Sequence, residues 1–351
     1  ERGEEASGQN WPGLPASLFL DYARTGNRAR FAKLRNQRRR ILTDLVLAEC
    51  IEKSGRFLDD ISDAVWSVCE ESYWGVPAHL GLQKAGIGLP DVEEPTVDLL
   101  AAETGSLLAW SVYLLGPDMD EVSPLLRRRV THEVTRRILQ PCREREDFWW
   151  MGFRGNREVN NWNPWINSNW LTCDLLLETD ETARAEATAR SMRSLDAFID
   201  GYPPDGGCDE GPGYWGRAGA SLFECLELLH SATGGAVDLF DEPLIQEIGR
   251  FIYRAHIHDS WFVNFADAAA ISHPPPSLLL RYGQFINDAD MQGFAEIRLA
   301  LGQAHRGRGV QHAGQPDRGV EQEPRGVPQR VVHARLQQVV DHHARQAEVA
   351  R

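Results

Sequence analysis

The chain has 351 residues, 42% of them hydrophobic, and a formal net charge of −14 at pH 7. This length is enough for a large buried core in one or two domains. The net negative charge argues against a nucleic-acid partner, which needs clustered lysines and arginines, although a few local arginines can still attract an anionic substrate.

Apolar residues recur at three- and four-residue spacing through the first 300 residues, which predicts one helix after another. These segments span residues 15–26, 38–55, 58–75, 97–116, 120–139, 163–178, 181–201, 217–234 and 242–258. Segment 97–116 is apolar on nearly all sides, as is typical of a buried helix. Strand-like alternation is scarce, and residues 261–270 are its best example.

Many helices joined by short Gly/Pro turns predict an all-α fold of helical hairpins over residues 1–302, arranged as a complete or incomplete (α/α) toroid. No fixed repeat is visible, which disfavours an open solenoid. Residues 303–351 contain no Trp, Phe, Tyr or Ile, so they can bury little apolar area, and we expect a disordered tail. The abrupt change in composition suggests the further hypothesis that this tail is an out-of-frame reading.

No apolar run approaches the roughly 20 residues of a membrane span, so we expect no membrane partner. We expect a cytoplasmic rather than a periplasmic or secreted protein, and a start at Glu1 instead of methionine is typical of a clipped N-terminus. The sequence does not indicate an oligomeric state. The six cysteines have no zinc-type spacing, which predicts buried free thiols and no metal site: Cys50, Cys69, Cys142, Cys173, Cys208 and Cys225.

The first polar cluster is the stretch Asn160–Trp170, in which five asparagines stand beside three tryptophans. Asn163 before Pro164 fits the cap of a helix, and capping is the simple explanation for that one residue. Asparagine offers both a donor and an acceptor, which suits sugar hydroxyls or a carboxyl group, and tryptophan rings can stack on sugars. The candidate substrate-binding residues here are Asn161, Trp162, Asn163, Trp165 and Asn167.

The second cluster is "YPPDGGCDEGPGYWGRAG", Tyr202 to Gly219, a loop between two predicted helices. Its glycines and prolines predict tight turns, and a solvated loop with one capping acid is the plain alternative. Glycines beside Glu210 would let the backbone come close to a ligand. We select Glu210 and Tyr214 as catalytic candidates, and Asp205, Trp215 and Arg217 as substrate-binding candidates.

The third cluster, "FIYRAHIHDSWFVNFADA", gives Tyr253 and His256 as catalytic candidates and Asn264 and Asp267 as substrate-binding candidates. His256 and His258 are two residues apart and would diverge on a helix, and either histidine is as easily structural. An earlier loop, "SYWGVPAHL", adds Trp74 and His79 as substrate-binding candidates, with core packing as the alternative for any one tryptophan.

Taken in order, "NNWNPWINSNWLTCDLLLE", "YPPDGGCDEGPGYWGRAG" and "WFVNFADA" resemble the heparinase II/III-like proteins over about Trp11 to Leu301. The resemblance implies an N-terminal (α/α) toroid followed by antiparallel β domains, and a polysaccharide lyase that acts on acidic, uronic-acid-containing polymers. It implies no cofactor within this chain, and a structural zinc in the β domains, which the chain lacks. Glu210 matches the family's carboxyl-binding glutamate, and Asn161, Asn163 and Asn167 match its helix-entry asparagines.

The chain departs from this pattern at Gly207, where heparinase II-like lyases have a histidine. Tyr253 is the nearest match to the catalytic tyrosine, with Phe262, which has no hydroxyl, as the alternative. We therefore expect a polysaccharide-lyase-like protein, and these departures leave open whether the chain is an active enzyme or a truncated and inactive one. Two other functions stay open: an α/α-barrel glycoside hydrolase that uses Asp205, Asp209 and Glu210, and a non-catalytic sugar-binding toroid.

Overall fold

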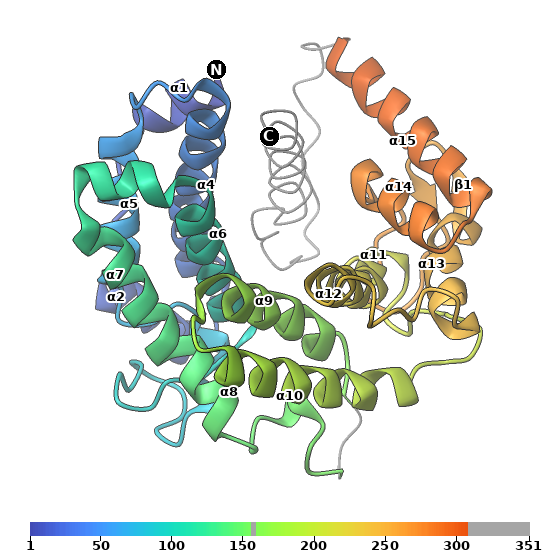
Figure 1. The fold of residues 1–351 in the computed structure, drawn as a ribbon, viewed down its shortest axis with the longest axis horizontal. Coiled ribbons are helices and arrows are strands. Elements are labelled where there is room, and N and C mark those ends of the chain that lie inside the picture. The colour runs from blue at the N-terminus through green and yellow to red at the C-terminus, as the bar shows by residue number, and fades with distance from the viewer. Residues whose placement is uncertain (156–158, 308–351) are drawn as a thin grey trace. The chain divides into compact units, whose positions relative to one another are not determined.

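The computed structural model describes residues 1–155 and 159–307, with side chains described as far as residue 301. The described part consists mostly of α-helices with one two-stranded sheet, which confirms the prediction of an all-α fold (Figure 1). The predicted tail begins at residue 303, but residues 303–307 continue the last helix, and residues 308–351 lie outside the described residues. The toroid stays a prediction.

The elements follow one another as short and long helices with a hairpin near the end. In chain order they are α1 (Arg2–Ser7), α2 (Ala16–Phe19), α3 (Asp21–Thr25), α4 (Ala29–Glu52), α5 (Leu58–Cys69), η1 (Pro77–Leu82), α6 (Leu99–Val122), α7 (Pro124–Val134), η2 (Thr135–Leu139), α8 (Gln140–Glu144), η3 (Trp149–Met151), α9 (Trp162–Leu177), α10 (Glu181–Asp200), α11 (Pro212–Trp215), α12 (Gly219–Ala232), α13 (Pro243–Arg254), β1 (His256–His258), β2 (Trp261–Phe262), α14 (Pro276–Phe285) and α15 (Ala289–Gly307).

The described residues divide into two compact units. Unit 1 contains Glu1–Phe148 and Asn169–Met192, and unit 2 contains Trp149–Ser168 and residues 193–307. The division falls within α9 and within α10, so each of these helices supplies residues to both units.

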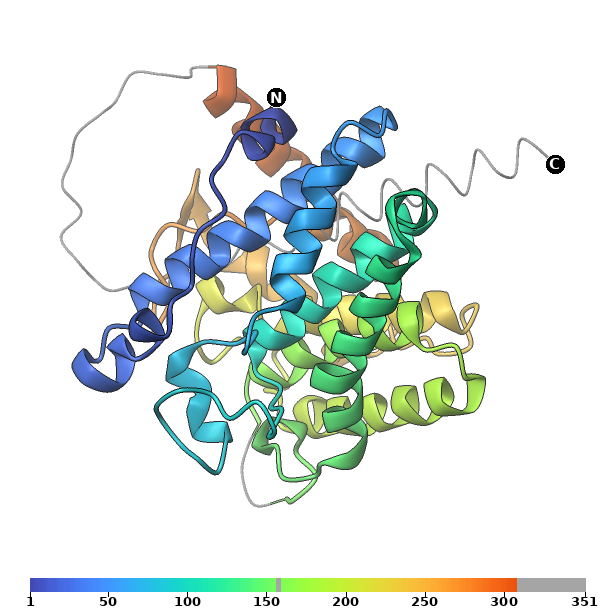
Figure 2. The same ribbon diagram turned by 90° about the vertical axis from the view of Figure 1, so that its left-hand side faces the viewer.

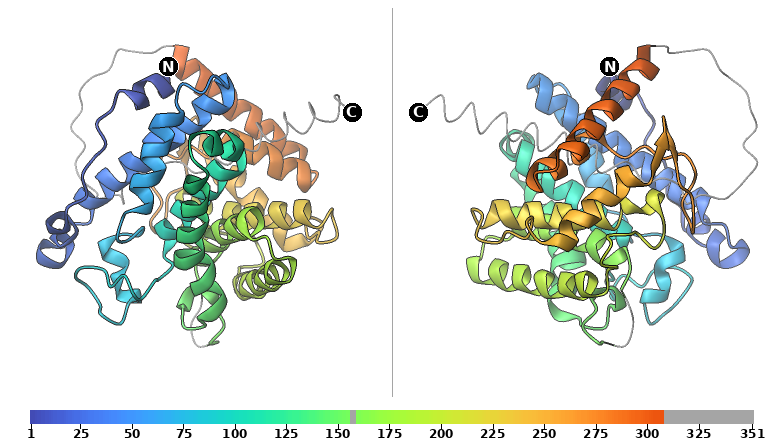
Figure 3. Two further views of the ribbon diagram at one scale, coloured as in Figure 1. Left: turned by 60° about the vertical axis from the view of Figure 1, so that its left-hand side comes forward. Right: turned by 90° about the vertical axis from the view of Figure 1, so that its right-hand side faces the viewer.

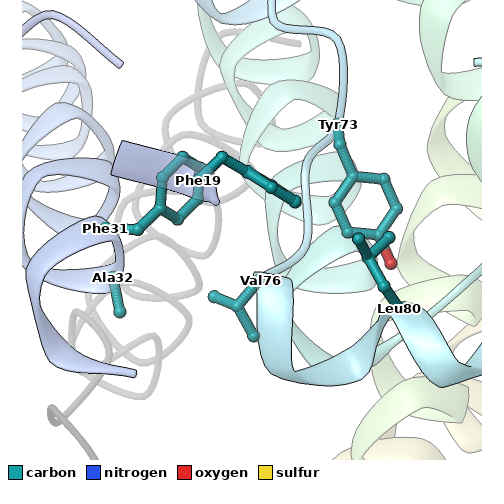
Figure 4. Close-up of a cluster of buried hydrophobic side chains, with 6 residues drawn as sticks. All are labelled: Phe19, Phe31, Ala32, Tyr73, Val76 and Leu80. Atoms are coloured by element: carbon teal, nitrogen blue, oxygen red, sulfur yellow. The ribbon is translucent and has the colours of Figure 1, made fainter. Parts of the chain in front are cut away.

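In unit 1, a buried cluster joins the start of α4 to α2 and η1 (Figure 4). The ring of Phe19 meets the edges of Phe31 at 4.8 Å and Tyr73 at 6.2 Å between centroids. Ala32, Val76 and Leu80 are the other buried residues of this cluster. Burial of such side chains contributes about 1.5–3 kcal/mol each, so this cluster fixes the N-terminal half of α4.

Helix α6 confirms the expectation of a buried helix. It is the one helix in the described part whose length and apolar composition would suffice to cross a membrane, yet 83% of that apolar window is buried inside the structure. The carboxylate of Asp98 accepts a hydrogen bond from the backbone nitrogen of Ala101 at 2.7 Å and so caps the helix start. A window buried to this extent is typical of a core helix.

In unit 2, a stack of aromatic rings joins α11, α12 and α14. Tyr282 stacks on Phe223 at 4.4 Å and on Trp215 at 6.3 Å between ring centroids. Its hydroxyl donates to the backbone carbonyl of Ile245 at 2.7 Å, which ties the stack to α13. The buried face of α13 carries Ile245, Ile248 and Ile252 at the three- and four-residue spacing that predicted a helix.

The structure corrects the predicted helix 242–258 at its end, because α13 stops at Arg254 and β1 follows. His256 and His258 therefore lie on a strand, where β1 pairs antiparallel with β2 in the register His256 to Phe262 and His258 to Trp261 (Figure 3, right). The predicted strand 261–270 is also shorter, since β2 covers only Trp261–Phe262, with one further bridge from Trp261 to Ile271.

Candidate functional site

The acidic residues of the loop between α10 and α11 hold its turns. Oδ1 of Asp205 accepts a hydrogen bond from the backbone nitrogen of Gly207 at 3.0 Å. Oδ1 of Asp209 accepts one from the backbone nitrogen of Glu210 at 2.9 Å. Both aspartates are exposed, whereas Glu210 is half-buried. Aspartate side chains commonly stabilise turns in this way. These turns fix the position of Glu210, the remaining acid of the loop.

Two glycines, which have no Cβ, allow this loop to approach the rest of unit 2 closely. Gly206 has φ of +73°, and a Cβ built on it would lie 2.2 Å from the backbone carbonyl carbon of Glu247 in α13. Gly211 has φ of +86°, and its Cβ would lie 2.6 Å from the carbonyl oxygen of Phe265. The close approach that the sequence suggested for these glycines is thus made to the protein's own backbone.

The contact at Gly211 brings the second and third sequence clusters together. Glu210 directly precedes Gly211, and Asn264 directly precedes Phe265, so these two polar residues flank one backbone contact between segments more than 50 residues apart. Asn264 and Asp267 are both exposed. The structure thus places Glu210, Asn264 and Asp267 on adjoining segments, as a shared site requires.

Tyr214 and Arg217 lie just after Glu210, on and beyond α11. Tyr214 is half-buried, and its backbone carbonyl accepts a hydrogen bond from the backbone nitrogen of Arg217 at 2.6 Å. The guanidinium of Arg217 lies 3.9 Å from the ring centroid of Trp165, a cation–π contact with the start of α9. Arg217 and Trp165 are therefore in contact, but Trp165 is buried and its ring is occupied by the arginine.

The asparagines of α9 form a buried network within the protein. The side-chain nitrogen of Asn163 donates to the carbonyl of Trp150 at 2.8 Å and to the carbonyl of Ser194 at 2.8 Å. That of Asn167 donates to the carbonyl of Asn163 at 2.9 Å and to the hydroxyl of Ser194 at 3.0 Å. Asn163 and Asn167 are both 0% exposed, so the predicted contact with substrate does not fit this placement.

Helix α9 also starts earlier than the predicted cap at Asn163. Its first residue is Trp162, whose backbone nitrogen donates to Oδ1 of Asn160 at 3.1 Å, and the backbone nitrogen of Trp165 donates to the carbonyl of Asn161 at 3.2 Å. Asn161 is buried. Trp162 is half-buried beside Trp149, with 5.2 Å between ring centroids. The cap therefore lies about two residues before the predicted position.

Trp215 belongs to the core of unit 2. It is 0% exposed, and its indole nitrogen donates to the backbone carbonyl of Ile248 at 2.7 Å. Its predicted role in substrate binding does not fit this burial, because a stacking platform must present its face to the ligand.

Tyr253, the predicted catalytic tyrosine, is engaged with the start of α15. Its hydroxyl donates to Oδ2 of Asp288 at 3.5 Å, and Nε of Arg250 donates to the same oxygen at 2.8 Å. Burial, together with the negative charge of Asp288, raises the pKa of Tyr253 above its usual value. A raised pKa disfavours the phenolate and so makes Tyr253 a poorer base.

His256 packs between the ring of Phe262 in β2, at 5.1 Å, and the ring of Phe294 in α15, at 5.0 Å between centroids. Its Nε2 lies 3.0 Å from the carbonyl oxygen of Asp259. These contacts explain the histidine as a structural residue of the β1–β2 turn.

In unit 1, the two predicted residues of the early loop also have structural partners. Trp74 is 1% exposed, and its indole nitrogen donates to the carbonyl of Val68 at 2.9 Å, so its predicted sugar contact does not fit. Nδ1 of His79 donates to Oδ2 of Asp98 at 2.7 Å. Burial alone would raise the pKa of Asp98, but the hydrogen bond and charge of His79 bring it below its usual value.

Sequence reasoning did not single out Phe265, an exposed aromatic residue of the third cluster. The side chains of Trp261 and Phe265 are 52% and 43% exposed. Trp261, Val263 and Phe265 recur at every second residue and are all exposed, so the two-residue period marks a face that they share.

Neither the cysteines nor any cluster of potential metal-binding residues forms a further candidate site in the described part. All six cysteines are buried and free, as predicted, and burial raises the pKa of Cys50 and of Cys208 to about 12. Among the residues that the structure describes, no group of three or more His, Cys, Asp or Glu side chains is placed to hold a metal ion.

No protein-family model matches this chain, and a search of curated proteins finds no similar sequence.

Proposed function

We propose that this chain is a polysaccharide-lyase-like protein that recognises uronic-acid-containing polysaccharide and cleaves it by β-elimination. The observation that carries the proposal is the backbone contact between Gly211 and Phe265, which sets Glu210 and Asn264 on adjoining segments. The resemblance of the motifs around these residues to heparinase II/III-like proteins supplies the substrate class.

The reaction needs a group that reduces the negative charge of the uronate C6 carboxylate, because this acidifies the proton on C5. Asn264 offers a neutral amide that can donate to the carboxylate, and Glu210 can share a proton with it, as paired carboxyl groups do. Removal of the C5 proton leaves an electron pair that forms the C4–C5 double bond. The C4–oxygen bond then breaks, and a proton passes to the departing glycosidic oxygen.

Tyr214 is the proposed proton-transfer group. It is half-buried and stands four residues after Glu210, on the short helix α11. Tyr253, by contrast, donates its hydroxyl to Asp288 and has a raised pKa. We therefore move the catalytic assignment from Tyr253 to Tyr214, and assign His256 a structural role.

The test is to incubate the full chain with a panel of uronic-acid polymers and follow ultraviolet absorbance. β-Elimination creates a conjugated unsaturated uronide, so absorbance rises with each cleavage. New reducing ends without absorbance would indicate hydrolysis instead, and binding without either product would indicate a non-catalytic carbohydrate-binding protein. Either of those two results would overturn the proposed reaction.

A further inference from the structure

The N-terminal part of unit 1 is strongly basic within an acidic chain. Between residues 6 and 43, Asp21 is the one acidic residue, whereas the same stretch has eight basic residues in a chain whose net charge is −14. They are Arg24, Arg28, Arg30, Lys33, Arg35, Arg38, Arg39 and Arg40. Such segregation creates a local positive potential that the overall charge does not reveal.

Three of these arginines have partners inside the protein. Arg39 pairs with both oxygens of Glu71 at 2.6 Å, and Arg38 donates to one of them at 2.9 Å. Arg35 is 1% exposed and donates to the carbonyl of Trp74 at 2.8 Å and to the hydroxyl of Thr104 at 2.7 Å. Glu71 is therefore already shared between two arginines and does not offset the charges at the surface.

The other basic residues of α4 share its solvent face. Arg30, Lys33 and Arg40 are exposed, and their spacing of three and seven residues sets them along one side of the helix. We call these three residues the basic stripe. It spans about 15 Å along the helix axis, from the rise of about 1.5 Å per residue. The buried cluster of Phe19, Phe31 and Tyr73 fixes this half of α4.

The charges of the stripe are poorly offset. Arg30 pairs with Asp21 at 2.9 Å. Across the described ranges, neither Lys33 nor Arg40 has an ion-pair partner or a hydrogen bond from its side chain. Arg24, exposed on α3 just before α4, adds a further cation.

The acidic residues of α1 lie at the other end of α4. Asp44, one helical turn beyond Arg40, is itself paired with Arg2 at 2.5 Å, and Glu4 lies 3.2 Å from Arg56. Figure 2 shows α1 beside the C-terminal end of α4, and α2 and α3 at its N-terminal end. Beside the stripe, Gln37 contacts Gln9 at 3.4 Å, a neutral pair.

We propose that the basic stripe binds a run of carboxylate or sulfate groups on an acidic polysaccharide chain. The surface is inferred from charge and exposure alone, and the polysaccharide class rests on the proposed function. Membrane lipid is a poorer partner, because no large hydrophobic residue between residues 6 and 43 is exposed, and Ile51, the exposed hydrophobic residue of α4, lies 11 residues beyond Arg40. Nucleic acid is disfavoured by the net charge of −14 and because no aromatic residue between residues 6 and 43 is exposed.

The test measures binding, not turnover, with the full chain and the double variant Lys33→Glu/Arg40→Glu. The matched control is Lys84→Glu/Arg128→Glu, which reverses two other exposed cations and changes the net charge equally. Heparin and alginate serve as acidic polysaccharides, and single-stranded DNA and phosphatidylserine vesicles serve as the other polyanions. Circular dichroism checks that both variants stay helical.

We expect the stripe variant to bind heparin or alginate at least about tenfold more weakly at low salt, because two exposed attractions become repulsions. The control variant should lose less than about threefold, since only the general field changes. The proposal is overturned if wild type binds neither polysaccharide, if the control loses as much as the stripe variant, or if DNA or vesicles bind more tightly. Binding that depends on the stripe without any elimination product would keep this surface and reject the lyase reaction.

Discussion

The side-chain amide of Asn163 donates hydrogen bonds to both the backbone carbonyl and the hydroxyl of Ser194, at 2.8 and 3.1 Å. Both residues are 0% exposed, so the bonds are shielded from water. This pair explains why an asparagine stands at the start of α9: its donors satisfy a buried carbonyl of α10 and hold the two helices together. Asn163 and Asn167 thus have a structural role in unit 2.

The substitution Asn163→Ala should destabilise the fold by roughly 2–4 kcal/mol, because it leaves the carbonyls of Trp150 and Ser194 buried without their donor. Urea unfolding followed by circular dichroism measures the change. The control is Asn264→Ala, at an exposed position, which should stay within about 0.5 kcal/mol of wild type. Normal stability of the Asn163 variant with lost polysaccharide binding would instead support its role in the site.

The substitution Gly211→Ala should cost several kcal/mol, roughly 2–4, since it adds a clash to a strained backbone. The added Cβ would lie 2.6 Å from the carbonyl oxygen of Phe265. Gly86→Ala separates the two effects, because Gly86 has φ of +71° but nothing within 4 Å of its Cβ position. That control should cost only about 1–2 kcal/mol, the usual penalty of a left-handed conformation for alanine. Equal costs at the two positions would mean that the loop does not press on Phe265.

Asp174 should make stability depend on pH in the direction opposite to most carboxylates. Burial raises the pKa of Asp174 to about 6, although Arg143 donates to it at 2.6 Å. A folded-state pKa above the unfolded value means that the folded protein holds the proton more tightly. The resulting stability is fully present below pH about 4 and is lost as the pH rises through about 6.

The comparison with Asp174→Asn isolates this effect. The difference in unfolding free energy, wild type minus variant, should fall by about 2 kcal/mol between pH 4 and pH 7. Guanidinium titrations at several pH values measure it. A difference that stays constant, or grows with pH, would show that Arg143 holds the carboxylate ionised throughout.

Much of the helical framework could be predicted from local sequence, whereas the contacts that form the site could not. The spacing of Ile245, Ile248 and Ile252 predicted α13 because a helix places such residues on one face. Ser194, however, lies 31 residues from Asn163, and no local pattern reveals that these two will share hydrogen bonds. Asparagines beside tryptophans therefore suggested a sugar site. In the structure, however, Asn163 is buried and its side-chain amide donates to groups of the protein itself.

The glycines also show that local sequence does not reveal contacts between distant segments. Their presence beside Glu210 predicted tight turns and a close approach of the backbone to a ligand. What approaches Gly211 is the backbone of Phe265, a contact set by the packing of distant segments. His256 was misplaced for a related reason: its helical spacing continues past Arg254, but the chain turns there into the β1–β2 hairpin.

The assignment of proton transfer to Tyr214 and not to Tyr253 leads to a separate prediction. The substitution Tyr253→Phe removes the hydroxyl that donates to Asp288 at 3.5 Å, a long and weak hydrogen bond. It should leave cleavage of a uronic-acid polymer within about threefold of wild type and cost at most about 1 kcal/mol of stability. A loss of cleavage by two orders of magnitude with intact folding would return the catalytic role to Tyr253.

The most direct measurement of the central claim is the rate of ultraviolet absorbance increase on uronic-acid polymers for wild type, Glu210→Gln and Tyr214→Phe. The account predicts that wild type forms an unsaturated product and that both variants lose at least about a hundredfold in rate, as removal of a proton-transfer group typically does. Both variants should keep the circular dichroism spectrum of wild type. Absence of unsaturated product from wild type on every polymer, or full activity of the Glu210 and Tyr214 variants, would contradict the account.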